Sequence, residues 1–170
     1  ASKRTGTERE FRMPEHCPAC GSQAVRLPGE AVARCTNLVD CPAQIRQGII
    51  HWCSRGALDI DGLGEKLVDQ FVTVDYVNTV ADLYALSHDQ LVDLDRIGDK
   101  SAQNLLDAIH ESKARPLHRA LFGLGIRLVG AHVAEVLSTH FRSLDALQRA
   151  SVEELTAVHE IGDKVAHSIR

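Results

Sequence analysis

The sequence has few aromatic residues and no long apolar run. Phe, Trp and Tyr make up 4% of the 170 residues, which argues against a sheet of base-stacking aromatics and an aromatic platform for sugars. No stretch approaches the roughly 18 consecutive apolar residues that a membrane helix requires. The opening residues 1–6 lack the apolar core of a signal peptide. We therefore expect a soluble intracellular protein with no membrane partner.

The cysteines do not fit a disulfide framework, because their number is odd and four of the five fall within 25 residues. Four sulfurs can complete a closed tetrahedron around zinc, which leaves no open position for a substrate and makes the ion structural. A redox Cys-x-x-Cys motif and four unrelated buried thiols are the alternatives, and the spacing favours zinc. The pattern C-x2-C-x14-C-x5-C is formed by Cys17, Cys20, Cys35 and Cys41.

Other residues near this pattern have simpler interpretations. His16 and His51 could substitute for a ligand, although a lone histidine is more often a polar surface residue. Cys53 falls on a helix predicted over 42–54, where we expect a small core thiol rather than a fifth ligand or a nucleophile. A β-hairpin is predicted from 24–27 and 31–35, around Pro28-Gly29.

The net charge is −4, and it is unevenly distributed. Residues 1–55 carry +3 and residues 56–170 carry −7. Nucleic-acid-binding domains usually have a positive excess, so this balance argues against a partner held by bulk electrostatics alone. It suits a protein-interaction module, in which helix faces meet a partner, better than it suits DNA binding.

Residues 56–170 contain four copies of one short motif, in which a glycine follows an apolar residue and precedes a basic residue by two places. An apolar residue also lies four places after each glycine. Strand-like alternation is scarce, whereas helical periodicity is clear over 100–113. The four copies are Leu63-Gly64-Glu65-Lys66, Ile97-Gly98-Asp99-Lys100, Leu124-Gly125-Ile126-Arg127 and Ile161-Gly162-Asp163-Lys164.

An offset of 64 residues joins the second copy to the fourth. Capping boxes are predicted at Ser87 to Gln90 and at Ser151 to Glu154, upstream of these two copies. Each unit should therefore open with a capped helix, turn at the glycine and enter a second helix. Further helices are predicted from Pro116 toward Phe122 and around 143–147. The chain should contain two pairs of such units.

A glycine turn followed by a cation is suited to binding phosphate. Glycine lets a phosphate approach the backbone, the N–H groups at the helix start can donate to it, and the helix dipole favours its charge. Such contacts carry no base information. The acids Glu65, Asp99 and Asp163 would have to point away from the phosphate. The plainer alternative is a set of capped hairpins whose charges face water, but four copies with one cation placement favour phosphate binding.

These repeats match the helix-hairpin-helix motif, and the order of parts resembles bacterial NAD+-dependent DNA ligase. The resemblance covers nearly the whole chain. Its landmarks are Phe-Arg-Met-Pro at 11–14, Cys-Pro-Ala-Cys-Gly at 17–21, Ser-Arg-Gly-Ala-Leu-Asp-Ile-Asp-Gly-Leu-Gly-Glu-Lys-Leu at 54–67, Gly-Asp-Lys-Ser-Ala at 98–102 and Leu-Gly-Ile-Arg-Leu-Val-Gly at 124–130.

The resemblance implies a mainly α fold with four helix-hairpin-helix motifs in two pairs, preceded by a small four-cysteine zinc finger with a short β-hairpin. Residues 1–14 would be a linker from an upstream domain, 15–55 the finger with a connecting helix, and 56–170 the helix-hairpin-helix domain. Zinc would bind Cys17, Cys20, Cys35 and Cys41. The implied DNA contacts are Gly62, Gly64, Lys66, Gly98, Lys100, Gly123, Gly125, Arg127, Gly162 and Lys164.

Members of that family transfer AMP from NAD+ through a lysine to a 5′-phosphate, and seal nicks between 5′-phosphate and 3′-hydroxyl ends in replication and repair. The adenylation motif resembles Lys-x-Asp-Gly, whereas residues 59–62 read Asp-Ile-Asp-Gly and lack the lysine. The resemblance therefore implies a fragment that is inactive alone and grips duplex DNA around a nick, independently of sequence. NAD+ and Mg²⁺ would be needed only in the missing catalytic domain.

The resemblance further implies a monomer that contacts other domains of the same ligase, in the bacterial cytoplasm at the nucleoid. Three alternatives stay open. The chain could be a protein-interaction module or the helix-hairpin-helix region of another repair protein. It could also be a thiol enzyme that uses the Cys-x-x-Cys motif with Cys53.

Overall fold

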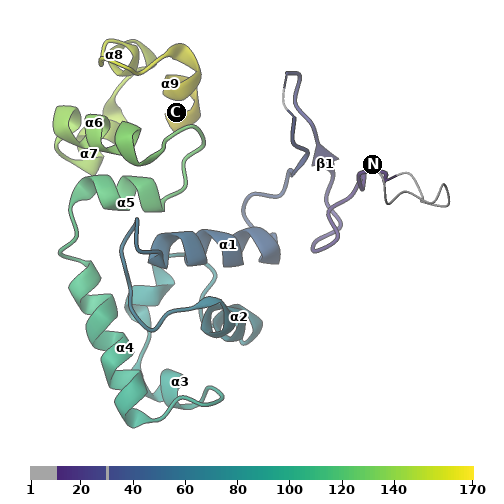
Figure 1. Ribbon diagram of the computed structural model, residues 1–170, viewed down its shortest axis with the longest axis vertical. Coiled ribbons are helices and arrows are strands. Elements are labelled where there is room, and N and C mark those ends of the chain that lie inside the picture. Colours follow the sequence, from purple (N-terminus) through teal and green to yellow (C-terminus); the bar gives the residue numbers. More distant parts are fainter. Residues whose placement is uncertain (1–10, 30) are drawn as a thin grey trace, which may run out of the picture. The chain divides into compact units, whose positions relative to one another are not determined.

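The computed structural model describes residues 11–29 and 31–170, which form two compact units (Figure 1). The first unit ends at Gln44 and the second covers Ile45–Arg170. Part of the linker expected over 1–14 therefore lies outside the described residues. Among the described residues, no helix is both long enough and apolar enough to span a bilayer.

The first unit contains a small antiparallel hairpin. Strand β1 (Ala24–Val25) pairs with β2 (Arg34–Cys35), with Ala24 opposite Cys35. The predicted hairpin is confirmed, although both strands are shorter than predicted. Of the described residues in this unit, only Cys41 is fully buried. An apolar core of this size cannot hold a fold together, so the unit needs another source of stability.

The regular elements of the second unit are all helices. Helix α1 starts in the first unit and runs into the second, which confirms the helix predicted over 42–54. The other predicted helices are also present. The elements are α1 (Pro42–Cys53), α2 (Glu65–Thr73), the 3-10 helix η1 (Asp82–Ala85), α3 (His88–Val92), α4 (Asp99–Ser112), α5 (Leu117–Gly123), α6 (Ala131–Phe141), α7 (Leu144–Arg149), α8 (Val152–Thr156) and α9 (Asp163–Ile169).

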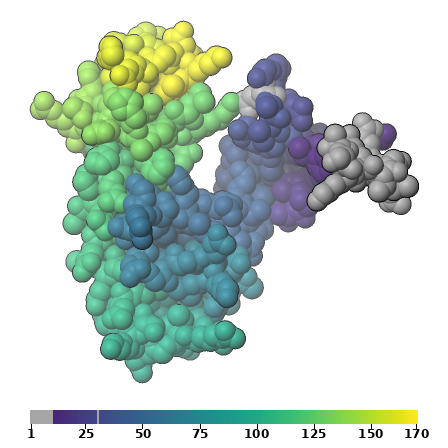
Figure 2. Space-filling model, in the orientation of Figure 1, coloured from purple at the N-terminus to yellow at the C-terminus, as the bar shows by residue number. Residues whose placement is uncertain are grey.

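Two hydrophobic clusters form the core of this second unit. The first draws on α1 to α4, with Phe71 and Leu83 fully buried, and the second draws on α5 to α9, with Leu137 and Leu155 fully buried. In the space-filling view the residues of α6 to α9 form one continuous lobe (Figure 2). Each cluster contains one pair of the sequence repeats, which confirms the predicted arrangement in pairs.

Cys53 belongs to the first cluster and is 5% exposed. Burial raises the pKa of its thiol to about 12, so the thiol is protonated and poorly nucleophilic at neutral pH. The prediction of a core thiol is confirmed. This residue is neither a fifth ligand of the cysteine cluster nor an activated nucleophile.

Helix α5 lies between the two clusters and joins them (Figure 1). The carbonyl oxygen of Phe122 lies 2.8 Å from His51 Nε2, and Arg119 Nε donates to the carbonyl of Ala57 at 2.6 Å. Gly123 is buried at this junction. A methyl group added at Gly123 would lie 3.0 Å from the Trp52 ring, so close packing requires glycine at this position.

Candidate metal centre and nucleic-acid interface

The four predicted metal ligands converge in the first unit. Their sulfur atoms, from Cys17, Cys20, Cys35 and Cys41, all lie within 4.8 Å of one another. The Cys20 and Cys35 sulfurs are 3.4 Å apart and those of Cys17 and Cys41 are 3.9 Å apart. Bonds of about 2.3 Å to a tetrahedral zinc ion would place sulfurs about 3.8 Å apart. The donor set therefore fits a zinc ion, and the distances exceed the roughly 2.05 Å of a disulfide.

Local backbone structure presents these sulfurs. The Cys17 N–H donates to the carbonyl of Ser22 at 2.7 Å, and Gly21 N–H donates to the carbonyl of Cys17 at 2.8 Å. This tight turn needs the φ of +73° at Gly21, which glycine adopts without strain. Cys35 lies on β2, and Cys41 lies just before α1. The turn and hairpin thus bring both halves of the motif together.

The environment of the sulfurs differs from one to the next. Hydrogen bonds from the hydroxyl and N–H of Ser22 lower the pKa of Cys20 to about 6, which favours a thiolate ligand at neutral pH. Desolvation raises the pKa of Cys35 to about 12. Neither histidine considered from the sequence joins the cluster of described residues: His16 forms a β-bridge with Gln23, and His51 bonds the Phe122 carbonyl.

The second candidate site consists of four backbone turns of one shape. In each, a residue with positive φ is followed by an apolar residue and then by an exposed glycine at the N-cap of a helix. The residue four places after that glycine is fully buried and anchors the helix. The turns are Gly62-Leu63-Gly64, Arg96-Ile97-Gly98, Leu128-Val129-Gly130 and Glu160-Ile161-Gly162, followed by the anchors Val68, Ala102, Ala134 and Ala166.

The structure corrects the third copy. Sequence reasoning aligned Gly123, Gly125 and Arg127 with the other turns and put Arg127 in a helix's first turn, but α6 starts only at Ala131, after the N-cap Gly130. Gly125 and Arg127 lie in the connection between α5 and α6. The residue equivalent to Lys66, Lys100 and Lys164 is His132. The prediction was wrong because a second apolar-glycine pair, at 129–130, lies five residues downstream.

The starts of the helices differ between two groups. The helices that follow the four turns, α2, α4, α6 and α9, have glycine at the N-cap and no side-chain cap. In contrast, α3, α7 and α8 are capped by Ser87, Ser143 and Ser151, and the two predicted capping boxes at Ser87 and Ser151 are confirmed. Backbone N–H groups at an uncapped helix start need an outside acceptor. The four turns thus present donors to an anion.

Space around these glycines is open. A methyl group built at any of the four N-cap glycines would meet no atom within 4 Å. Lys66, Lys100 and Lys164 are exposed in the first turns. The Asp99 carboxylate lies 3.8 Å from His88 Nε2, on the neighbouring helix α3. At this turn, therefore, the acid has a partner within the protein.

The turns are paired by equivalent contacts. Asp95 N–H donates to Gln70 Oε1 at 3.0 Å and links the second turn to α2, which follows the first. The Ser168 hydroxyl donates to the carbonyl of Arg127 at 2.6 Å and links α9 to the third turn. Gln70 and Ser168 occupy the same place, six residues after an N-cap glycine. Each pair therefore behaves as one structural module.

Three protein families match successive parts of the chain. Residues 16–43 match the family described as the NAD-dependent DNA ligase C4 zinc finger domain. Residues 54–111 match the SAM-like helix-hairpin-helix tandem family, and residues 119–170 match the helix-hairpin-helix motif family. The match over 119–170 covers the buried residues of the second cluster, and the match over 54–111 covers those of the first except Ile49 and Cys53.

Similar curated proteins carry the name DNA ligase. The chain is 55% identical over 167 residues to a DNA ligase of Bacillus cereus, 54% to one of Bacillus thuringiensis and 53% to one of Bacillus licheniformis. Each alignment covers 98% of this chain and 25% of the relative, so the chain spans about a quarter of the length of these relatives. The chain therefore matches, along almost its whole length, one region of proteins named DNA ligase, and its four-cysteine unit matches the zinc finger family of NAD-dependent DNA ligases.

Proposed function

We propose that this chain binds duplex DNA around a nick, independently of sequence, as the non-catalytic zinc finger and helix-hairpin-helix region of an NAD+-dependent DNA ligase. The observation that carries the proposal is the set of four open, glycine-capped helix starts, each preceded by the same turn. Such helix starts favour phosphate oxygens through their N–H groups and their dipoles. Contacts of this kind position a duplex without reading its bases.

Within this function the protein contacts divide into two groups. Gly62, Gly64, Gly98 and Gly162 let the phosphate chain approach the backbone, and Lys66, Lys100 and Lys164 supply charge beside it. Gly130 and His132 take the third place, instead of the more distant Gly125 and Arg127. Gly123 serves packing. The negative charge of residues 56–170 is compatible with this function because the contacts are local and the donors are backbone dipoles.

The four-cysteine cluster holds a structural zinc ion. Zinc would supply the stability that the first unit lacks in its apolar core, and with four sulfur ligands it leaves no open position for chemistry. The finger with its connecting helix, 15–55, then leads into the DNA-binding domain, 56–170. NAD+ and Mg²⁺ act in a catalytic domain with which this chain works, as a monomer in the bacterial cytoplasm.

The test is a pair of charge reversals at two turns. Lys100→Glu together with Lys164→Glu should weaken binding to nicked duplexes of any sequence, measured by fluorescence anisotropy of the zinc-loaded chain. Lys113→Glu is the control for each single reversal, because Lys113 lies near the Tyr84 ring just after α4, away from the turns. Equal binding by the double variant and the wild type would refute the assignment. Failure of the wild type to bind any duplex would favour a protein partner instead.

A further inference from the structure

The third turn differs from the other three in its first helical residues. The helices after the first, second and fourth turns, α2, α4 and α9, begin with an acidic residue followed by lysine. In contrast, α6 begins with Ala131 and His132. The third turn therefore carries an imidazole where the other three carry an ammonium group.

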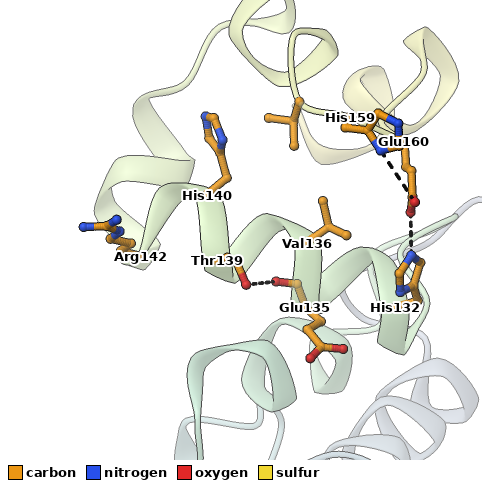
Figure 3. Close-up of a pocket in the computed structure, with 9 residues that line it drawn as sticks. His132, Glu135, Val136, Thr139, His140, Arg142, His159 and Glu160 are labelled. Atoms are coloured by element: carbon orange, nitrogen blue, oxygen red, sulfur yellow. Dashed lines mark hydrogen bonds and ion pairs between the residues drawn. The ribbon is translucent and has the colours of Figure 1, made fainter.

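His132 also has a partner from the paired turn. Its Nε2 lies 2.5 Å from Oε2 of Glu160, the positive-φ residue of the fourth turn (Figure 3). The other carboxylate oxygen of Glu160 lies 3.6 Å from Nδ1 of His159. The equivalent places in the other three turns hold Gly62, Arg96 and Leu128, none of which is acidic. Among the four described turns, the third is therefore the only one whose helix, α6, has a carboxylate of the paired turn beside the residue in the cation position, His132.

We propose that Glu160 competes with DNA phosphate for His132, so that the third turn engages DNA only when a phosphate displaces this carboxylate. The inference rests on the proposed function, because it concerns the same backbone sites. Both groups are accessible: the side chain of His132 is 70% exposed and that of Glu160 is 44% exposed. An exposed ion pair of this kind shifts an equilibrium by up to about fivefold, which a phosphate contact can overcome.

Other ionisable groups lie near the His132–Glu160 pair. The pair lies at one end of an open groove of about 740 Å³ between α6 and the turn before α9. Glu135 of α6 and His159 of the turn are the other ionisable groups at this end, and His140 and Arg142 lie farther along α6 (Figure 3). The imidazole of His132 can pair with either a carboxylate or a phosphate, so Glu160 and DNA compete for one side chain.

The test compares two charge removals in the same groove. Glu160→Gln should bind a nicked duplex about two- to fivefold more tightly than the wild type at pH 6 and low salt. The plot of log affinity against log salt should steepen by about 0.9, the contribution of one added phosphate. Glu135→Gln removes the same charge without touching His132, and should give a smaller gain.

A second variant separates this mechanism from a general charge effect. In a His132→Ala background, Glu160→Gln should give no more gain than Glu135→Gln. A gain that persists without His132, or equal gains from the two glutamine variants at pH 6, would overturn the competition while leaving DNA binding intact. A wild-type chain that binds no duplex at any salt concentration would instead refute the proposed function, and the competition with it.

Discussion

The same substitution by alanine should lower stability at one glycine of the third repeat and weaken DNA binding at another. Gly123 is buried, and an added methyl group would lie 3.0 Å from Trp52 Cε3, 3.1 Å from the Ala57 methyl and 3.1 Å from Leu58 Cδ2. Overpacking of this kind costs about 1–3 kcal/mol, and the better helix propensity of alanine returns up to about 1 kcal/mol. We therefore expect Gly123→Ala to lower the free energy of unfolding by about 1–2 kcal/mol.

Gly130→Ala is the matched comparison, because a methyl group there meets no atom within 4 Å. Loss of a glycine N-cap should cost under about 1 kcal/mol, while the methyl group obstructs an approaching phosphate. Thermal unfolding should place Gly123→Ala about 2–8 °C below the wild type, whereas anisotropy should show weaker DNA binding only for Gly130→Ala. If Gly123→Ala were fully stable and bound DNA poorly, the corrected register of the third turn would be refuted.

Three further predictions concern stability and reactivity. Chelation of zinc should release one ion per chain and unfold the first unit, while the far-ultraviolet circular dichroism of the helices persists. The reason is that Cys41 alone among the described residues of the first unit is fully buried. Retained amide protection in that unit would contradict this prediction. In the native zinc-loaded chain, Cys53 should resist thiol reagents at pH 7, because burial raises the pKa of its thiol to about 12. Mass mapping of the labelled sites should show labelling of Cys53 only after unfolding. Hydrogen bonds from the N–H groups of Asn78 and Thr79 lower the pKa of Asp82 from 3.8, so its carboxylate stabilises the fold above that pH. Asp82→Ala should therefore lower the free energy of unfolding by about 1 kcal/mol at pH 7, and by less below pH 4, where acid protonates the wild type. Chemical denaturation at both pH values would check this.

Much of the fold could be predicted because local signals agree with tertiary structure. The spacing of Cys17 and Cys20 is sufficient to indicate a knuckle, and the serines at 87 and 151 cap helices where the capping-box pattern places them. The limits of β1 and β2 were harder to predict, because the ladder has only two residue pairs and one of them contains the predicted zinc ligand Cys35. Two residues per strand carry little sequence signal.

The third turn shows why a motif can be misplaced by a few residues. Leu124-Gly125 and Val129-Gly130 have the same apolar-glycine pattern, and a basic residue follows only the first of them by two places. A buried residue follows both glycines by four places, Val129 and Ala134, so only the start of α6 at Ala131, after the N-cap Gly130, distinguishes them. The pattern does not indicate His132, because it requires lysine or arginine two places after the glycine. The pairing of His132 with Glu160 depends on contacts 28 residues apart, which no local pattern specifies.

The most direct test of the central claim is the salt dependence of binding to nicked duplexes of two unrelated sequences, measured by anisotropy with the zinc-loaded chain. Four backbone clamps that each neutralise about one phosphate, the third of them masked by Glu160 in the wild type, predict equal affinities for both sequences and a slope between about −2.7 and −3.6 in log affinity against log salt. Affinities that differ tenfold between the sequences, or a slope near zero, would contradict binding through the phosphate backbone.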